Sequence, residues 1–205
     1  MKNIKNTKIE KAIITLSNND SKMLTLIEKF GIINLKPRRR YFESIVKIII
    51  GQQLSLKAAD SIAKKVFNYY ADKPTAEKIV ATDDLTLRSL GLSNAKVKYV
   101  KDFSLKYINK EIKLTNFLRM SNDEIISELT KVKGIGVWSA HMFLIFYLAR
   151  FDVLPYSDLG IKKAIMLVYG LKNLPDEETV KKIAEKNSWN PYESVAALYL
   201  WKSLE

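Results

Sequence analysis

The chain has 205 residues, of which 47% are hydrophobic, and its formal net charge at pH 7 is +12. This length suits one domain or two small lobes that share a cleft. It contains no cysteine and a single histidine, His141, which excludes disulfides, thiolate zinc sites, iron–sulfur clusters and multi-histidine metal sites. The charge favours a polyanionic partner, nucleic acid or an acidic membrane surface, although a lysine-rich solvated surface explains it equally well.

Membrane insertion and secretion are not expected. No run of 18 or more apolar residues is present, and the charged start MKNIKNTKIEK lacks the apolar core of a secretory signal. We therefore expect no membrane partner and a location in the cytoplasm, associated with the nucleoid, or in the nucleus of a eukaryote.

The hydrophobic periodicity is helical along nearly the whole chain. Helical segments are predicted over residues 8–18, 21–30, 55–70, from 74, from 82, 96–109, from 121, 137–151, 158–168, 176–187 and 191–203. A basic connector and a very apolar run at 42–50 follow the segment 21–30. Gly31 is a predicted helix stop, Thr82 a predicted N-cap, and Ser121 with Glu124 a predicted capping box. Strand signals are nearly missing, so we predict an all-α fold of about ten helices.

Residues 130–142, TKVKGIGVWSAHM, predict two helices joined by a short turn. Glycine supplies the positive φ that a tight reversal needs and leaves the backbone open to a large group. The second helix begins with free N–H groups and a partial positive charge, which favour a phosphate. Lys131, Lys133 and the Ser139 hydroxyl strengthen this interpretation, while a plain helix–helix turn remains the alternative.

An isolated acid, Asp158, precedes the next predicted helix. An aspartate there serves as an N-cap, and one carboxylate also suffices to stabilise the cationic sugar formed when a glycosidic bond breaks. Such a reaction on DNA needs aromatic side chains to stack an extruded base. Trp138, Trp189, Tyr192 and Trp201 are candidates, with core packing as the alternative for each.

Three blocks together resemble the helix-hairpin-helix Gly/Pro-Asp superfamily of DNA glycosylases, and its 3-methyladenine DNA glycosylase II branch in the compact form without an N-terminal β-rich domain. The blocks are IIGQQLSLKAA (49–59), KGIGVWSA followed by DVLPYSDLGIKK, and WNPYESVAALYLW (189–201). The resemblance implies an all-α, two-lobed fold with the hairpin and the acid at the cleft. One lobe would cover residues 41–150 with the hairpin at about 123–150, and the other would combine 1–40 with 151–205.

The resemblance also implies residue roles. Asp158 takes the position of the catalytic aspartate. DNA contacts fall to Gly134, Gly136 and Ser139 at the hairpin and to Gln53 in the gap left by the flipped nucleotide. Beside them we expect DNA contacts from Lys133, because of its charge, and from Leu54, which follows Gln53. The substrate-pocket positions are Trp138, Trp201 and Met142. No cofactor is expected, except that the backbone carbonyls of Thr130, Val132 and Ile135 match a structural Na⁺ or K⁺ site.

Departures from the family pattern refine the expected activity. Bifunctional members carry a lysine nucleophile just past G-x-G, where this chain has Trp138, so Schiff-base lyase chemistry is not expected. Ser157 replaces a second acid, and His141 is expected to pack the helix or rim the pocket. We predict a monomeric, monofunctional enzyme that removes alkylated purines of the 3-methyladenine and 7-methylguanine type from double-stranded DNA.

Three alternatives stay open at this point. The first is a glycosylase of the same fold for oxidised or mismatched bases, and the second is a non-catalytic helix-hairpin-helix DNA-binding module. The third concerns the three arginines at residues 38–40. Either they attach the protein to DNA, or they form a solvated linker.

Overall fold

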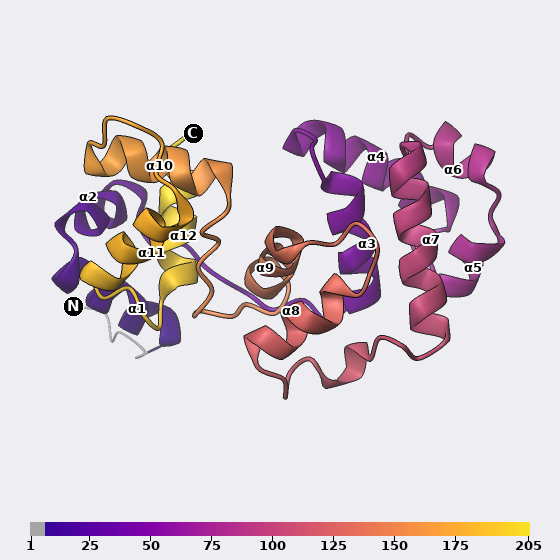
Figure 1. Ribbon diagram of the computed structural model, residues 1–205, viewed down its shortest axis with the longest axis horizontal. Helices are drawn as coiled ribbons and strands as arrows, with labels where there is room; N and C mark the ends of the chain where they lie inside the picture. Colours follow the sequence, from indigo (N-terminus) through magenta and orange to yellow (C-terminus); the bar gives the residue numbers. More distant parts are fainter. Residues whose placement is uncertain (1–6) are drawn as a thin grey trace. The chain divides into compact units, whose positions relative to one another are not determined.

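The computed structural model describes residues 7–205, and within them it has twelve α-helices, one short 3-10 helix and no strand (Figure 1). The predicted all-α class is confirmed. None of the helices in this range is long and apolar enough to cross a membrane. The first six residues of the charged start lie outside the described residues.

The chain divides into two compact units. The terminal unit runs to Pro37 and resumes from Ala149 to Glu205, and the middle unit covers Arg38–Leu148. The sequence prediction placed its boundaries after residues 40 and 150.

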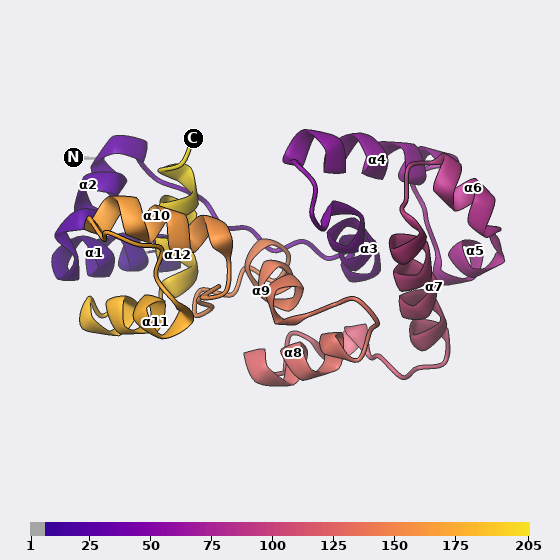
Figure 2. The same cartoon turned by 45° about the horizontal axis from the view of Figure 1, so that its top comes forward.

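The terminal unit contains five helices. They are α1 (Lys8–Asn19), α2 (Ser21–Phe30), α10 (Leu159–Tyr169), α11 (Glu177–Lys186) and α12 (Glu193–Lys202). Helix α12 contacts α1, α2 and α10, and Figure 2 shows it among them. Trp189 and Tyr199 are fully buried in this core, and the Tyr199 hydroxyl donates to the Gly31 carbonyl at 2.7 Å. The terminal unit therefore has its own hydrophobic core, to which both α12 and α10, the helix that Asp158 caps, contribute residues.

The middle unit contains the remaining helices. They are α3 (Tyr41–Gly51), α4 (Leu56–Tyr69), α5 (Ala76–Ala81), α6 (Asp84–Ser89), α7 (Asn94–Ile108), the 3-10 helix η1 (Leu114–Asn116), α8 (Asn122–Thr130) and α9 (Val137–Phe146). Helix α3 contacts α4, α7 and α9, and α8 contacts α9. The Phe143 ring meets Tyr41 and Phe117 edge-on. These contacts form the core that supports the turn between α8 and α9.

Local capping signals predict some of the helix ends correctly. The capping box of Ser121 and Glu124 is confirmed at the start of α8, and Gly31 ends α2 with a φ of +66°. The prediction for Thr82 is wrong, because Asp83 caps α6 by accepting the Thr86 amide at 2.8 Å. The Thr82 hydroxyl instead accepts from Tyr70 and donates to the Lys78 carbonyl, both at 2.8 Å.

The helix predicted over 137–151 ends earlier than expected. Helix α9 stops at Phe146, and Ala149 adopts a left-handed φ of +54°. Leu148 and Phe151 are nevertheless buried. The apolar run thus continues beyond the helix because its residues enter a core, and burial alone does not require helical backbone.

Candidate active site

The turn between α8 and α9 uses its two glycines for different purposes. Gly134 has a φ of +83°, and a Cβ added to it would lie 2.3 Å from the Tyr99 ring, so only glycine fits there. Gly136 has a φ of −98° and is the N-cap of α9 without a side-chain cap. Nothing lies within 4 Å of a Cβ added at Gly136. The first glycine allows close packing, and the second leaves the N-terminus of α9 open to an anion.

An aspartate on α7 holds the turn from the other side. The Lys133 amide donates to Asp102 Oδ2 at 2.8 Å, and the Lys106 ammonium donates to both Asp102 oxygens at 2.8 and 2.9 Å. Burial raises the pKa of Asp102, but the hydrogen bonds from Lys106 and Lys133 outweigh it and leave the pKa below its ordinary value. An ionised Asp102 therefore fixes the backbone of Lys133, whose side chain is exposed.

Ser139 is buried in the first turn of α9. Its side chain is 4% exposed, and its hydroxyl oxygen accepts from Gln52 Nε2 at 3.1 Å. The same Gln52 nitrogen donates to the Gly134 carbonyl at 2.8 Å. The phosphate contact expected of Ser139 stays a prediction. The structure adds Gln52 as its neighbour, a residue for which the sequence analysis predicted no role.

Gln53 and Leu54 lie in the loop between α3 and α4. Both are exposed, and Gln53 has a left-handed φ of +56°, which is uncommon for a residue other than glycine. The loop thus presents two side chains next to the residue that contacts the hairpin.

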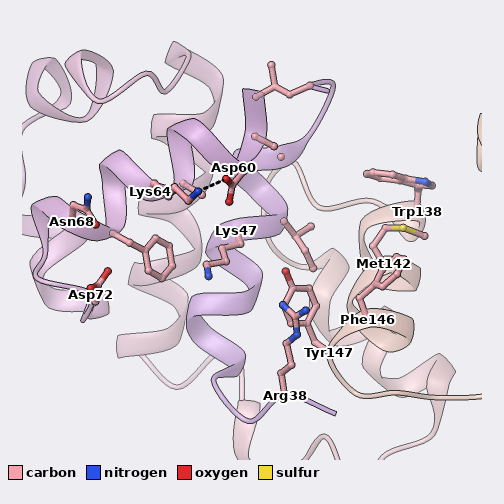
Figure 3. Close-up of a pocket in the computed structure, with 16 residues that line it drawn as sticks. Arg38, Lys47, Asp60, Lys64, Asn68, Asp72, Trp138, Met142, Phe146 and Tyr147 are labelled. Atoms are coloured by element: carbon pink, nitrogen blue, oxygen red, sulfur yellow. Dashed lines mark ion pairs between the residues drawn. The ribbon is translucent and has the colours of Figure 1, made fainter. Parts of the chain in front are cut away.

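A pocket of about 640 Å³ opens on one face of α9. Trp138, Met142 and Phe146 follow one another at four-residue intervals and line it together, as Figure 3 shows. Across from them lie polar side chains of α3 and α4, including Lys47 and the ion pair of Asp60 with Lys64 at 2.7 Å. The structure therefore brings the predicted pocket residues Trp138 and Met142 into one apolar wall and adds Phe146 to it.

Asp158 caps α10 in the terminal unit. Its Oδ1 accepts the Ile161 amide at 2.8 Å and the Trp201 indole N–H at 2.9 Å. A Cβ added at Gly160 would lie 3.0 Å from Asp158 Oδ1 and 3.2 Å from the Trp201 ring. The side chains of Asp158 and Trp201 are half-buried. The N-cap interpretation of Asp158 is confirmed, and the carboxylate is also held by an indole that approaches over a glycine.

The tryptophan candidates are divided between the two units. Trp201 belongs to the terminal unit with Asp158, whereas Trp138 belongs to the middle unit with the hairpin. Trp189 is fully buried in the terminal core and donates to Asp20 at 2.8 Å. Core packing is therefore the role of Trp189.

Three further residues singled out in the sequence lie inside the middle unit. His141 is 4% exposed on α9, and burial lowers the pKa of its imidazole, which favours the neutral form at pH 7. Arg38 donates its amide to the Tyr147 carbonyl at 2.8 Å, and its guanidinium lies 5.4 Å from the centre of that ring. Arg40 pairs with Glu43 at 3.2 Å. Arg38 and Arg40 thus support the fold of their own unit.

Comparison with known proteins establishes the family. A model described as HhH-GPD superfamily base excision DNA repair protein matches residues 46–190. The chain therefore belongs to the HhH-GPD superfamily of base excision DNA repair proteins, and the resemblance found in the sequence is confirmed.

Relatives from Schizosaccharomyces pombe match almost the full chain. The chain is 34% identical to DNA-3-methyladenine glycosylase 1 over 205 residues, which cover 96% of this chain and 88% of the relative. It is 33% identical to the alkylbase DNA glycosidase-like protein mag2 over 193 residues, 91% of this chain and 90% of the relative. The structure of the Schizosaccharomyces pombe 3-methyladenine DNA glycosylase Mag1 with abasic DNA matches with a TM-score of 0.86, 33% identity, and coverage of 94% and 96% of the two chains.

Proposed function

We propose that this protein is a monofunctional DNA glycosylase that removes alkylated purines from double-stranded DNA and leaves an abasic site. The observation that carries the proposal is the geometry of Asp158, whose Oδ1 is fixed by the Ile161 amide and the Trp201 indole. A carboxylate held in one orientation stabilises a developing positive charge without reorganising. The names of the two Schizosaccharomyces pombe relatives support the choice of substrate.

The chemistry needs few groups because the substrate is already charged. Alkylation at N3 or N7 makes the purine cationic. When the N-glycosidic bond breaks, its electron pair moves to the purine and neutralises it, while C1′ of the deoxyribose becomes cationic. Asp158 stabilises this cation and orients a water, whose oxygen bonds to C1′ and whose proton passes to the carboxylate or to solvent.

The pocket on α9 suits the extruded base. The Trp138 ring is 37% exposed beside Met142 and Phe146. An electron-rich indole attracts a cationic base by roughly 0.5–2 kcal/mol. We infer that Trp138 stacks on the alkylated purine and favours it over neutral bases.

Attachment to DNA rests on charge and on the open helix terminus. The net charge of +12 predicts binding that weakens steeply with salt. The amides at the start of α9 beside Gly136 would hold a backbone phosphate without reading sequence. We infer that the protein acts as a monomer in the compartment that holds the DNA.

A structural cation at the hairpin is a smaller part of the proposal. Na⁺ or K⁺ would bind the carbonyls of Thr130, Val132 and Ile135, and backbone oxygens suit such ions. The Val132 carbonyl already accepts the Ile135 amide at 3.1 Å, which leaves that oxygen one lone pair for an ion. When bound, the ion would offset the partial negative charge of these carbonyl oxygens beside the proposed phosphate site.

The decisive experiment compares the wild type with Asp158→Asn on methylated duplex DNA, with heat or alkali converting abasic sites to breaks. Asparagine is also a good N-cap, so helix α10 should survive while base release falls by about 10²–10³-fold. Asp176→Asn is the matched control, since Asp176 caps α11 by accepting the Thr179 amide at 2.8 Å. Full base release by Asp158→Asn would show that the carboxylate is only a cap.

Two further readouts test the rest of the proposal. Strand breaks without heat or alkali, or a covalent adduct trapped with borohydride, would contradict the monofunctional mechanism. Release of 8-oxoguanine or hypoxanthine ahead of 3-methyladenine would contradict the alkylpurine assignment. A wild type that binds duplex DNA and releases no base would be a binding module.

A further inference from the structure

We propose that Gln52 is a positioning residue that couples the phosphate-binding hairpin to the exposed Gln53–Leu54 loop, so that the two contact DNA as one unit. This inference rests on the proposed function, because it assumes that both elements contact damaged DNA. It concerns a glutamine that lies 82 and 87 residues before its two partners.

The first support is the use of the Gln52 amide. Helix α3 ends at Gly51, and Gln52 follows as its C-cap residue. Its Nε2 donates to the Gly134 carbonyl at 2.8 Å and to the Ser139 hydroxyl oxygen at 3.1 Å. An amide nitrogen has two hydrogens, so both are used on the hairpin. One side chain thus joins the end of α3 to both sides of the turn that starts α9.

The second support is the strained backbone next to it. Gln53 has a φ of +56°, a conformation that is strained for a non-glycine residue and persists only where the surroundings impose it. The Leu54 amide donates to the Gly51 carbonyl at 3.2 Å, which closes the loop. The bonds of Gln52 fix the residue just before the strained one. The direction of the Gln53 side chain therefore depends on the hairpin.

The third support is a shared foundation on α7. Lys96 Nζ donates to the Ile50 carbonyl in the last turn of α3 at 2.7 Å, and burial lowers the pKa of Lys96. Three residues further along α7, the Tyr99 ring fills the space beneath Gly134. One face of α7 therefore supports the end of α3 and the hairpin together. Lys96, Tyr99, Gln52, Gln53, Gly134 and Ser139 all line one hollow of about 320 Å³.

The arrangement has a consequence for DNA contact. Because the Ser139 oxygen accepts from Gln52, its own hydrogen must point to a different acceptor. The distance between the α9 terminus and the exposed Gln53 and Leu54 side chains is set by the same bonds. With a phosphate held at the hairpin, Gln53 and Leu54 would reach a fixed position relative to the lesion. Loss of Gln52 should therefore impair lesion recognition more than attachment to intact DNA.

The test uses Gln52→Met, which keeps the length of the side chain and removes its donors. Affinity is measured for intact duplex and for duplex with a tetrahydrofuran abasic analogue beside 2-aminopurine, whose fluorescence reports insertion into the gap. We expect about fivefold to tenfold weaker binding to the abasic analogue and a smaller fluorescence change, for the loss of two hydrogen bonds. Binding to intact duplex should change less than about twofold. Equal weakening on both duplexes would indicate a merely structural role and overturn the inference.

A double-mutant cycle with the neighbouring glutamine provides the sharper readout. Gln53→Ala should weaken abasic-analogue binding in the wild type and have little further effect in Gln52→Met, since the loop is then already misplaced. Independent, additive losses would overturn the coupling. Gln52→Glu, which keeps the size but cannot donate when ionised, replaces Gln52→Met if that variant unfolds.

The two hypotheses fail in different ways. A wild type that releases no base rejects only the proposed function. The binding measurements need no base release, so they still test the coupling in that case. Normal base release together with unchanged lesion discrimination in Gln52→Met and Gln52→Glu rejects only the coupling.

Discussion

Asp20 and Asp158 occupy similar positions in the terminal unit. Each caps a helix, and each accepts a tryptophan indole N–H. Asp20 Oδ1 accepts the Lys22 and Met23 amides at 2.9 and 3.2 Å, and its Oδ2 accepts from Trp189 at 2.8 Å and from the Tyr169 hydroxyl at 2.5 Å. Both oxygens of this carboxylate thus have partners, and Asp20 is only 3% exposed.

Asp158 differs from Asp20 in its exposure. The Ile161 amide and the Trp201 indole both use Oδ1, and the side chain is half-buried rather than sealed. The capping role of Asp158 is therefore compatible with the catalytic role that we propose for it. A sealed carboxylate that accepts from four donors serves stability, whereas a half-buried carboxylate held in one orientation suits the reaction that we propose.

Asp20→Ala should give the largest loss of stability. It removes a helix cap worth about 1 kcal/mol and leaves the buried Trp189 and Tyr169 donors without their acceptor, at about 1–2 kcal/mol each. We expect the free energy of unfolding, measured with urea, to fall by about 3–5 kcal/mol. The control Asp176→Ala removes an exposed cap and should cost about 1 kcal/mol. Similar losses in the two variants would contradict the structural role of Asp20.

Replacing each indole by a phenyl ring separates the two aspartates further. Trp189→Phe should lower the free energy of unfolding by about 2 kcal/mol and leave base release by the folded protein unchanged. Trp201→Phe should reduce base release about tenfold with little change in stability, because Asp158 loses one of the donors that orient it. A phenyl ring still stacks on a base. Full activity of Trp201→Phe would therefore show that Trp201 acts only by stacking.

The contact between Asp20 and Tyr169 also predicts a loss of stability at alkaline pH. Burial raises the pKa of Tyr169, and the hydrogen bond to Asp20 and its charge raise it further. The folded state therefore keeps the proton where the unfolded chain, with a pKa of about 10, loses it. The contribution of Tyr169 to the free energy of unfolding is fully present below about pH 10. Above that pH the free energy of unfolding falls by at most about 1.4 kcal/mol per pH unit.

Tyr169→Phe should make this alkaline decline shallower. Denaturation curves between pH 8 and 11 measure it, and Tyr69→Phe, which removes an exposed hydroxyl, should leave the slope as in the wild type. An unchanged slope in Tyr169→Phe would mean that other groups cause the decline.

The sequence reveals features that are local along the chain. The Ser121 capping box, the Gly31 stop and the cap at Asp158 each depend on neighbours within a few residues, so each could be predicted. The G-I-G turn could also be located, but its rigid environment could not. Gln52, Tyr99 and Asp102 reach it from segments some 30 to 90 residues away.

Asp20 shows the same limit on prediction. Its capping role follows from its place before α2, yet its partners Tyr169 and Trp189 are 149 and 169 residues distant. Nothing in the local sequence distinguishes the sealed Asp20 from the half-buried Asp158. The end of α9 at Phe146 was missed for a related reason, because Leu148 and Phe151 carry on the apolar pattern in non-helical backbone.

Gly160→Ala should have the smallest effect and isolates the orientation of Asp158. The added Cβ would lie 3.0 Å from Asp158 Oδ1 and within 3.3 Å of the Trp201 ring, so one of them must move by a few tenths of an ångström. Alanine favours helix over glycine by up to about 1 kcal/mol, so stability should stay level or rise. We expect base release to fall about threefold, as one hydrogen bond weakens. In the Trp201→Phe background the same change should add little, since both act through one contact. Lower stability with full base release would mean that glycine at this position serves only packing.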